Sequence, residues 1–178
     1  MASTLKINNI DTASGTTITI PTGKQVIVTD EGGLRVPGTV IQVVENATTT
    51  QMSQGGTSFT DTNLTCTITP KYSNSKVLVM VKQYYTFRTT TTSERVGFTR
   101  LLRGSTEIVQ QANNIVAGMS TDHRRGTFAT FDILDSPSTT SATTYKTQGR
   151  LSDSSADLYY QHDSSRSTMV LMEIAQYN

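Results

Sequence analysis

The sequence predicts an all-β protein, an antiparallel jelly-roll sandwich preceded by a short β-stranded segment. Three observations lead to this class. Short runs of alternating polar and apolar residues recur along the chain, with turn residues between them. Threonine and serine are abundant, and charged residues make up 16% of the chain, against about a quarter in ordinary domains. No stretch of useful length has a helical period.

Residues 1–36 are predicted to form an N-terminal stalk or attachment segment. TTITI at 16–20 alternates with period two, PTG at 21–23 predicts a turn, and QVIV at 25–28 predicts a second strand. A third short strand is expected at 34–36. So few residues cannot bury a core alone. These strands therefore either pack on the main domain or wrap around the same strands of sister chains, and we favour the second arrangement.

Residues 37–178 are predicted to form the head domain, which opens with the turn residues Pro37 and Gly38. A strand is expected at 39–45, followed by a polar loop at 46–56. The next strand, at 58–70, shows the clearest alternation in the chain, because every second residue from Leu64 is apolar. Its single cysteine, Cys66, is expected on the buried face of this strand.

The second half of the head adds further strands. Residues 76–87 are apolar on both faces and are expected in the centre of a sheet. A hairpin is predicted about Arg103 and Gly104. A short strand is expected at 158–161, and the last strand at 167–175. About eight antiparallel strands in a domain of this length suit a two-sheet jelly roll.

Residues 127–150 are interpreted as two strands joined by a long turn. Phe128 and Phe131 lie in the first strand and Tyr145 in the second. Pro137 ends the first strand, because it lacks a backbone N–H and fixes its own φ.

Composition excludes several classes of function. The formal net charge is +1, so no strong field favours nucleic acid or an anionic membrane. No window approaches the roughly 20 apolar residues of a membrane span. One cysteine allows no internal disulfide. No apolar run follows Met1, so we expect synthesis in a cytoplasm without a signal peptide.

Several segments of the sequence resemble those of one protein family. PGTVIQVVE, SFTDTNLTCTITPKYSNSKVLVMV, TRLLRGSTEI, FDILDSPSTTSATTYKTQ and the final MVLMEIA are similar to the distal domain of fibre proteins of tailed bacteriophages, most closely those of marine podoviruses. The opening STLKINNIDTASGTTITIPTGKQVIVTD resembles the start of the same proteins. The resemblance implies a virion structural protein, a homotrimer whose head is a jelly roll of the complement and tumour-necrosis-factor type. It brings no fixed catalytic residues.

From the resemblance and the unpartnered N-terminal strands we expect a trimeric tail fibre or spike. Residues 1–36 would attach to other virion proteins of the tail or capsid, and the head would contact a host-surface glycan or protein. Two alternatives remain open. One is a capsid decoration or head-fibre protein without a receptor role. The other is a glycan-cleaving depolymerase.

The candidate receptor-binding residues are aromatic, acidic and histidine side chains near two loops. Tyr159, Tyr160, His162 and Asp163 follow one another closely, and His123 lies in the loop STDHRRG. Aromatic rings beside carboxylates suit sugar binding by stacking and hydrogen bonding. Both groups also have an ordinary explanation, as packing at a strand end and as a solvated loop tip.

Candidate catalytic and metal-binding acids are few. Glycoside cleavage needs two carboxylates at a fixed separation in a cleft, and Asp132, Asp135 and Glu173 are the residues considered for it. We interpret them as acids at strand ends and expect no enzyme. Asp153, Asp157 and Asp163 are spaced unlike an EF-hand calcium loop, so no metal or cofactor is expected.

Four charged residues around the predicted hairpin are candidates for contacts between chains: Glu94, Arg95, Arg100 and Arg103. Arg100 and Arg103 flank an apolar pair, and near a trimer axis such charges pair across chains. Pairing on the surface of one chain is the simpler alternative.

Overall fold

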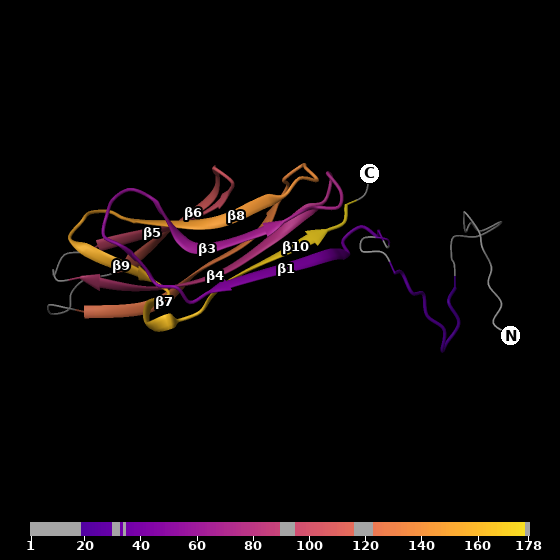
Figure 1. Ribbon diagram of the computed structural model, residues 1–178, viewed down its shortest axis with the longest axis horizontal. Coiled ribbons are helices and arrows are strands. Elements are labelled where there is room, and N and C mark those ends of the chain that lie inside the picture. Colours follow the sequence, from indigo (N-terminus) through magenta and orange to yellow (C-terminus); the bar gives the residue numbers. More distant parts are fainter. Residues whose placement is uncertain (1–18, 30–32, 34, 90–94, 116–122, 177–178) are drawn as a thin grey trace.

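The structure, a computed structural model, is a sandwich of two β-sheets with an extended N-terminal arm (Figure 1). It describes residues 19–29, 33, 35–89, 95–115 and 123–176. The arm leaves the sandwich at one end, and strands β7 and β9 reach toward the opposite end. We call residues 19–29 the arm, and the end of the sandwich far from it the distal end.

The lower sheet in Figure 1, here sheet A, is built around one long strand, β4. Its members are β1 (Val40–Thr48), β2 (Met52–Gln54), β4 (Lys76–Thr89), β7 (His123–Asp135), β9 (Ala156–Tyr160) and β10 (Ser167–Ile174). Strand β4 pairs with β7 along one edge, and with β10 and then β9 along the other. Strands β1 and β2 lie beyond β10 and β9.

The upper sheet, sheet B, has four strands in the order β3-β8-β5-β6. They are β3 (Thr60–Ile68), β5 (Arg95–Arg103), β6 (Thr106–Ile115) and β8 (Thr143–Leu151). Strands β5 and β6 form the predicted hairpin about Arg103 and Gly104, and Gly104 has a φ of 58° that favours glycine.

Strand order establishes the jelly roll directly. When β1 is counted with β2, and β9 with β10, as interrupted strands, the described chain has eight strands. Sheet A then has the order first, eighth, third, sixth, and sheet B has second, seventh, fourth, fifth. This is the order of two interlocked Greek keys. The predicted fold class, an all-β antiparallel jelly roll, is confirmed.

The two strands predicted within residues 127–150, and the long turn between them, are confirmed as β7 and β8, which lie in different sheets. The loop predicted at 46–56 was wrong in part, because it contains the end of β1 and all of β2. Between β9 and β10 the chain forms a short 3-10 helix, η1 (His162–Ser164). No helix in the described part of the chain is long and apolar enough to cross a membrane.

The core lies between the sheets, and strict alternation fills it. On β3 the inward residues Leu64, Cys66 and Ile68 are at most 4% exposed, while the threonines between them face out. Burial raises the pKa of the Cys66 thiol, which keeps the thiol protonated and unreactive. The predicted inward position of Cys66 is therefore confirmed.

Polar side chains in the core form a satisfied network. Gln83, in the middle of β4, is fully buried. Its Oε1 accepts hydrogen bonds from the hydroxyls of Thr62 and Thr147, at 3.0 and 2.8 Å. Its Nε2 donates to Ser167 Oγ at 3.1 Å. Because each partner is itself buried, this network links both sheets without leaving Gln83 unpaired.

Glu173 is fully buried in β10 and fixes the turn between β3 and β4. Its carboxylate accepts hydrogen bonds from the backbone N–H groups of Lys71 and Tyr72 and from Gln42 Nε2, at 2.6 to 3.1 Å. Burial alone would raise the pKa of Glu173, but these hydrogen bonds outweigh it and lower that pKa below its ordinary value.

The turn predicted at residues 21–23 of the arm is confirmed. The backbone N–H of Lys24 donates to the carbonyl of Pro21 at 3.0 Å, and Gly23 has a φ of 79°. A left-handed glycine at the third position is what a type II turn requires.

The strand predicted at residues 25–28 is not formed within one chain. Val26, Ile27 and Val28 are 64, 71 and 43% exposed. Pairing with sister chains stays a prediction. The strands predicted at 16–20 and 34–36 fall partly on residues 16–18 and 34, which lie outside the described residues, and their described residues form no strand.

Residues 35–39, just before β1, are fastened to the head. The N–H of Gly38 donates to the Ala175 carbonyl at 2.8 Å, and that of Thr39 to the Val36 carbonyl at 3.0 Å, which forms the turn predicted at residues 37 and 38. The guanidinium of Arg35 lies 4.2 Å from the centroid of the Tyr72 ring.

Replacing Gly149 with alanine should destabilise the head by about 1–3 kcal/mol, the usual effect of overpacking. The ring of the fully buried Tyr160 lies where a Cβ at Gly149 would be. The measurement is chemical denaturation followed by circular dichroism. Gly97→Ala is the control, because a Cβ there comes no closer than 3.4 Å to the Leu158 side chain. Equal loss in both variants would contradict this account.

Glu173→Gln should lower stability at neutral pH by about 1–3 kcal/mol, since backbone N–H groups lose a charged acceptor. The folded-state pKa of Glu173 is lowered, so its contribution is full above the unfolded pKa of about 4.3 and is lost as pH falls through the folded pKa. The difference in unfolding free energy between wild type and variant should therefore shrink below about pH 4. A difference independent of pH would contradict the assignment.

Candidate functional site

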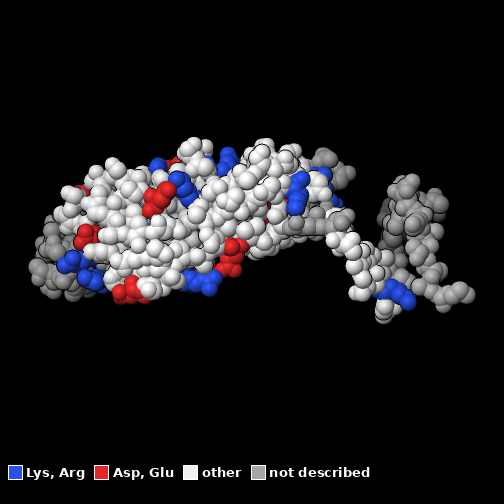
Figure 2. Space-filling view, viewed as in Figure 1, with Lys and Arg blue, Asp and Glu red and all other residues white. Residues whose placement is uncertain are grey.

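The candidate site is a group of polar and aromatic side chains on the outer face of sheet A near the distal end. We call it the distal cluster, and it consists of Arg88, Arg124, Asp157, Tyr159, His162 and Asp163. Strands β4, β7 and β9 bring these residues together with η1. Figure 2 shows acidic and basic side chains close together near this end of the molecule.

His162 is the centre of the cluster. Its ring lies against Tyr159, with 5.4 Å between ring centroids. Its Nδ1 lies 3.0 Å from a carboxylate oxygen of Asp163, and its Nε2 lies 3.4 Å from Nη1 of Arg124. A guanidinium only donates, so Nε2 is the acceptor and the proton of a neutral ring sits on Nδ1, facing Asp163.

Two arginines are cross-strand neighbours beside this ring. Arg88 on β4 is the direct cross-strand partner of Arg124 on β7. On its other side Arg88 is opposite Asp157 of β9, and their charged atoms lie 3.7 Å apart. The hydroxyl of Tyr159 donates to the same carboxylate at 3.2 Å. Like charges directly opposite on a sheet are destabilising, and Asp157 is a carboxylate that pairs with one of the two arginines.

The turn that presents His162 and Asp163 has an unusual backbone. Gln161, Asp163 and Ser164 all have φ between 51° and 59°, a left-handed conformation that non-glycine residues rarely adopt. Gln161 is fully buried, its amide lies 3.0 Å from Ser167 Oγ, and its backbone N–H donates to the Tyr84 carbonyl at 3.2 Å. The buried glutamine therefore holds the strained turn in place, and such strain is concentrated at functional sites.

An aromatic pair extends the cluster along the sheet. The rings of Tyr84 and Phe128 pack edge to face at 5.2 Å, and Phe128 is 41% exposed. Lys82 Nζ lies 4.4 Å from the Phe128 ring centroid. The Tyr84 phenol lies over Gly126, where a side chain would collide with it. The outer face thus carries aromatic surface next to cationic groups.

The structure places some of the predicted receptor-binding residues in the distal cluster and others outside it. Tyr159, His162 and Asp163 lie in the distal cluster. Tyr160 was a wrong choice, because it is fully buried and its hydroxyl lies 2.9 Å from the Thr99 hydroxyl. His123 is the first residue of β7, beside Arg124, and its side chain lies outside the described part of the structure.

Three residues important to the site were not predicted to belong to it. Arg88, Tyr84 and Phe128 are far from the η1 turn in sequence, and only the pairing of β4 with β7 and β9 places them there. No local pattern in the sequence signals this, because the pairing joins residues separated by tens of positions.

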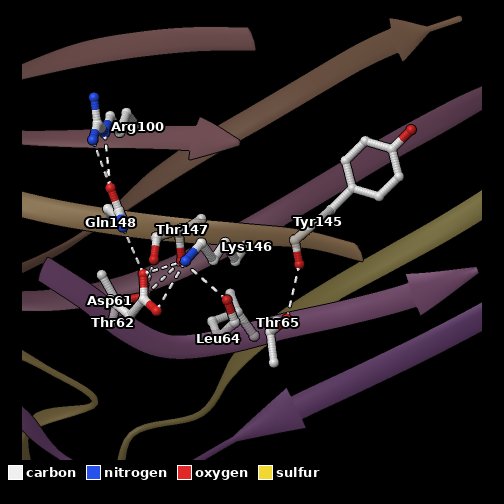
Figure 3. Close-up of polar contacts among 9 residues, drawn as sticks. All are labelled: Asp61, Thr62, Leu64, Thr65, Arg100, Tyr145, Lys146, Thr147 and Gln148. Atoms are coloured by element: carbon white, nitrogen blue, oxygen red, sulfur yellow. Dashed lines mark hydrogen bonds and ion pairs between the residues drawn. The ribbon is translucent and has the colours of Figure 1, made fainter. Parts of the chain in front are cut away.

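The outer face of sheet B carries a second polar surface. Figure 3 shows Arg100, Gln148 and Asp61 linked in a row across three strands. Lys146 pairs with Asp61 at 3.0 Å, beside a bulge in β3 where Asn63 has a φ of 66°. Burial raises the pKa of Asp61, but the bonds from Gln148 and Lys146 outweigh it and leave that pKa below its ordinary value. These groups satisfy one another, so this surface stabilises the sheet.

The arginines proposed for contacts between chains have partners within the chain. Arg100 pairs with Glu107 at 2.8 Å, and Arg103 pairs with Asp135 at 2.7 Å. The surface-pairing alternative therefore describes both residues. Glu94 lies outside the described residues, and of Arg95 only the backbone, at the start of β5, is described.

The carboxylates considered for glycoside cleavage do not converge. Asp132 is exposed on the outer face of β7, and Asp135 accepts hydrogen bonds from Arg103 and from the Tyr145 hydroxyl, each at 2.7 Å. Glu173 is occupied by the turn before β4. Burial, together with the bond to Asp135, raises the pKa of Tyr145 above its ordinary value. Asp135 on sheet A therefore links the two sheets through its bonds to Arg103 and Tyr145 on sheet B.

Acids that could chelate a metal are also engaged separately. Asp153 accepts from the Ser155 backbone, while Asp157 and Asp163 contact different partners in the distal cluster. Within residues 19–29, 33, 35–89, 95–115 and 123–176, no three histidine, cysteine or acidic side chains are grouped to hold a metal ion.

A row of apolar side chains lies on the outer face of sheet A, near the arm. The four residues are direct cross-strand neighbours on β1, β10, β4 and β7, and we call them the apolar row: Val43, Met172, Leu78 and Leu134. The two end members, Val43 and Leu134, are 55 and 52% exposed. Contiguous exposed apolar surface of this kind marks interaction sites.

Comparisons with known proteins give no family. No family model and no curated protein matches the chain. Similar solved structures include the infectious bursal disease virus Gt strain, with TM-score 0.37, 16% identity, and coverage of 75% of this chain and 38% of that chain. For T=1 particles derived from infectious bursal virus the values are 0.37, 14%, 85% and 41%.

A further similar structure is dimeric latent PorU from Porphyromonas gingivalis, with TM-score 0.37, 10% identity, and coverage of 81% of this chain and 14% of that chain. This chain thus spans well under half the length of each of these three chains. At such TM-scores the similarities assign no function, and the class of the protein, an antiparallel jelly roll, rests on its own strand order.

Asp135→Ala should destabilise the head by about 1–3 kcal/mol, because it leaves the buried Tyr145 hydroxyl without its acceptor and removes the carboxylate that pairs with Arg103. Asp132→Ala should change stability by less than about 0.5 kcal/mol, since Asp132 is exposed. Thermal unfolding of both variants measures the difference. Equal effects would show that Asp135 is not the tie described here.

Proposed function

We propose that this chain is a non-enzymatic structural protein of a bacteriophage virion, the head of a homotrimeric tail fibre or spike. Residues 1–36 attach it to the virion, and the distal cluster faces the host surface. The observation that carries this proposal is the division of the molecule between its two ends. Uncovered apolar residues gather at the arm end, and an aromatic and charged cluster lies at the other.

The arm supports self-association. Val26, Ile27 and Val28 are exposed, and the arm leads away from its own head (Figure 1). On the outer face of sheet A at the same end, the two end members of the apolar row are exposed and the two middle members are half-buried. Because neither surface reaches the other within one chain, a second copy is the occupant that covers both. Three copies related by a threefold axis close such contacts into a ring without leaving a free end.

The fastening of residues 35–39 to the head supports attachment through the N-terminal segment. Arg35 Nη2 donates to the Asn74 side chain at 2.6 Å, and its guanidinium lies over the Tyr72 ring. The Gly38–Ala175 backbone bond fastens the next turn to the end of β10. An attachment segment would therefore join the head at a fixed point, the residues just before β1.

A capsid decoration or head-fibre protein without a receptor role is the second candidate. The apolar row favours it, because exposed apolar side chains on a flat sheet also suit lateral packing against a capsid surface. A depolymerase is not proposed, since Asp132, Asp135 and Glu173 have separate surroundings.

Immunogold labelling of purified particles, with antibodies against this protein, tests the proposal. Gold confined to the tail supports a fibre or spike, and gold on the capsid supports the decoration alternative. Absence of gold from the particles would contradict a virion role.

Ile27→Asp, introduced into the virus, should remove the protein from purified particles. A charge on the arm opposes burial of its apolar residues against a second copy or a virion protein. Thr22→Asp is the control, because Thr22 lies in the exposed turn of the arm and is already polar. Quantitative immunoblotting measures incorporation, and full incorporation of Ile27→Asp would show that the arm does not act through apolar contact.

A further inference from the structure

The distal cluster has an arginine whose charge is not neutralised by the described part of the protein. Arg124 forms no ion pair with any described carboxylate, and its contact is the acceptor Nε2 of His162. That contact uses one of five guanidinium donors. Asp157 lies on the far side of Arg88 from Arg124. The carboxylate of Asp163 faces the opposite nitrogen of the His162 ring, so the imidazole separates it from Arg124.

A repulsion between neighbouring cations accompanies this arrangement. Arg88 and Arg124 are directly opposite each other in the register of β4 and β7. An anion placed beside Arg124 would form charge-assisted hydrogen bonds with the remaining donors and offset the repulsion. The charges thus favour a ligand with a carboxylate or phosphate group.

The guanidinium is also held in advance of binding. Nε2 of His162 accepts from Arg124, Tyr159 packs on the same ring, and the left-handed turn that carries His162 is fixed by the buried Gln161. Pre-organised groups bind more tightly because less freedom is lost on association.

Aromatic surface adjoins the arginine and indicates what else the ligand presents. Tyr159 and His162 are half-buried with their rings packed at a tilt of 58°, and farther along the face Phe128 is 41% exposed beside Tyr84. Such rings pack against the apolar C–H face of a sugar, while hydroxyl and carboxylate groups nearby bond to its hydroxyls.

We propose that the distal cluster binds an anionic saccharide, with the acidic group on Arg124 and the sugar ring on the aromatic surface around Tyr159. This deepens the proposed function, on which it rests, by naming the chemical class of the host-surface ligand. Carboxylated and phosphorylated sugars share the chemistry that Arg124 recognises.

The test is a ligand-observed NMR titration of the full chain with two acidic sugars and their neutral counterparts. The probes are 3′-sialyllactose with lactose, and mannose 6-phosphate with mannose. We expect an acidic sugar to bind more tightly than its neutral counterpart, and its binding to weaken as salt is raised. Which of the two binds identifies the source of the acidic group. If neither acidic sugar binds better than its counterpart, the proposal is overturned.

Matched variants assign the binding to Arg124. Arg124→Gln should weaken binding of the acidic sugar by about tenfold or more, as expected for a lost charged hydrogen bond. Arg125→Gln removes the same charge from the next residue, which faces the other side of the strand, and should keep most of the binding. Thermal melts confirm that both variants fold. If both variants bound the acidic sugar equally weakly, the loss would come from the change in net charge and not from Arg124, and the assignment would be overturned. The immunogold labelling does not depend on sugar binding. The saccharide inference can therefore fail while the virion role stands.

Discussion

Strand β4 is the constraint on which the rest of the structure depends. It is paired along both edges, with β7 on one side and with β10 and β9 on the other. Successive side chains of a strand point to opposite faces, so β4 supplies both the core and the outer surface. Its inward residues Val77, Val79 and Val81 are at most 4% exposed. Its outward residues run from Leu78, in the apolar row, to Arg88, in the distal cluster.

This arrangement explains why two different surfaces share one sheet. Near the arm, the cross-strand neighbours of β4 are apolar, and at the distal end they are charged and aromatic. The break between β9 and β10 falls between these regions, where the buried Gln161 precedes the short η1 turn that carries the half-buried His162. One end of the sheet is therefore suited to contact with protein, and the other to contact with a polar ligand.

Local sequence patterns predict much of the fold, but they predict only part of the candidate site. Alternation about Leu64 and Cys66 identified β3 and its buried face, and Gly104 identified the hairpin, because both signals lie within a few residues. The partners of β7 and β8 could not be predicted, since assignment to a sheet depends on contacts between distant strands. Tyr159 and Tyr160 are adjacent, so alternation sends one inward and one outward without saying which. Arg88 belongs to the site only because the register of β4 against β7 and β9 places it there.

The central claim is that uncovered apolar surface at the arm end is covered by sister chains in a trimer. Sedimentation equilibrium of the purified full-length protein at micromolar concentration tests it most directly. The account predicts a mass of three times the 19.4 kDa of one chain. A mass of 19.4 kDa that persists as concentration is raised would contradict it, and the protein would then be a monomeric jelly-roll binding module.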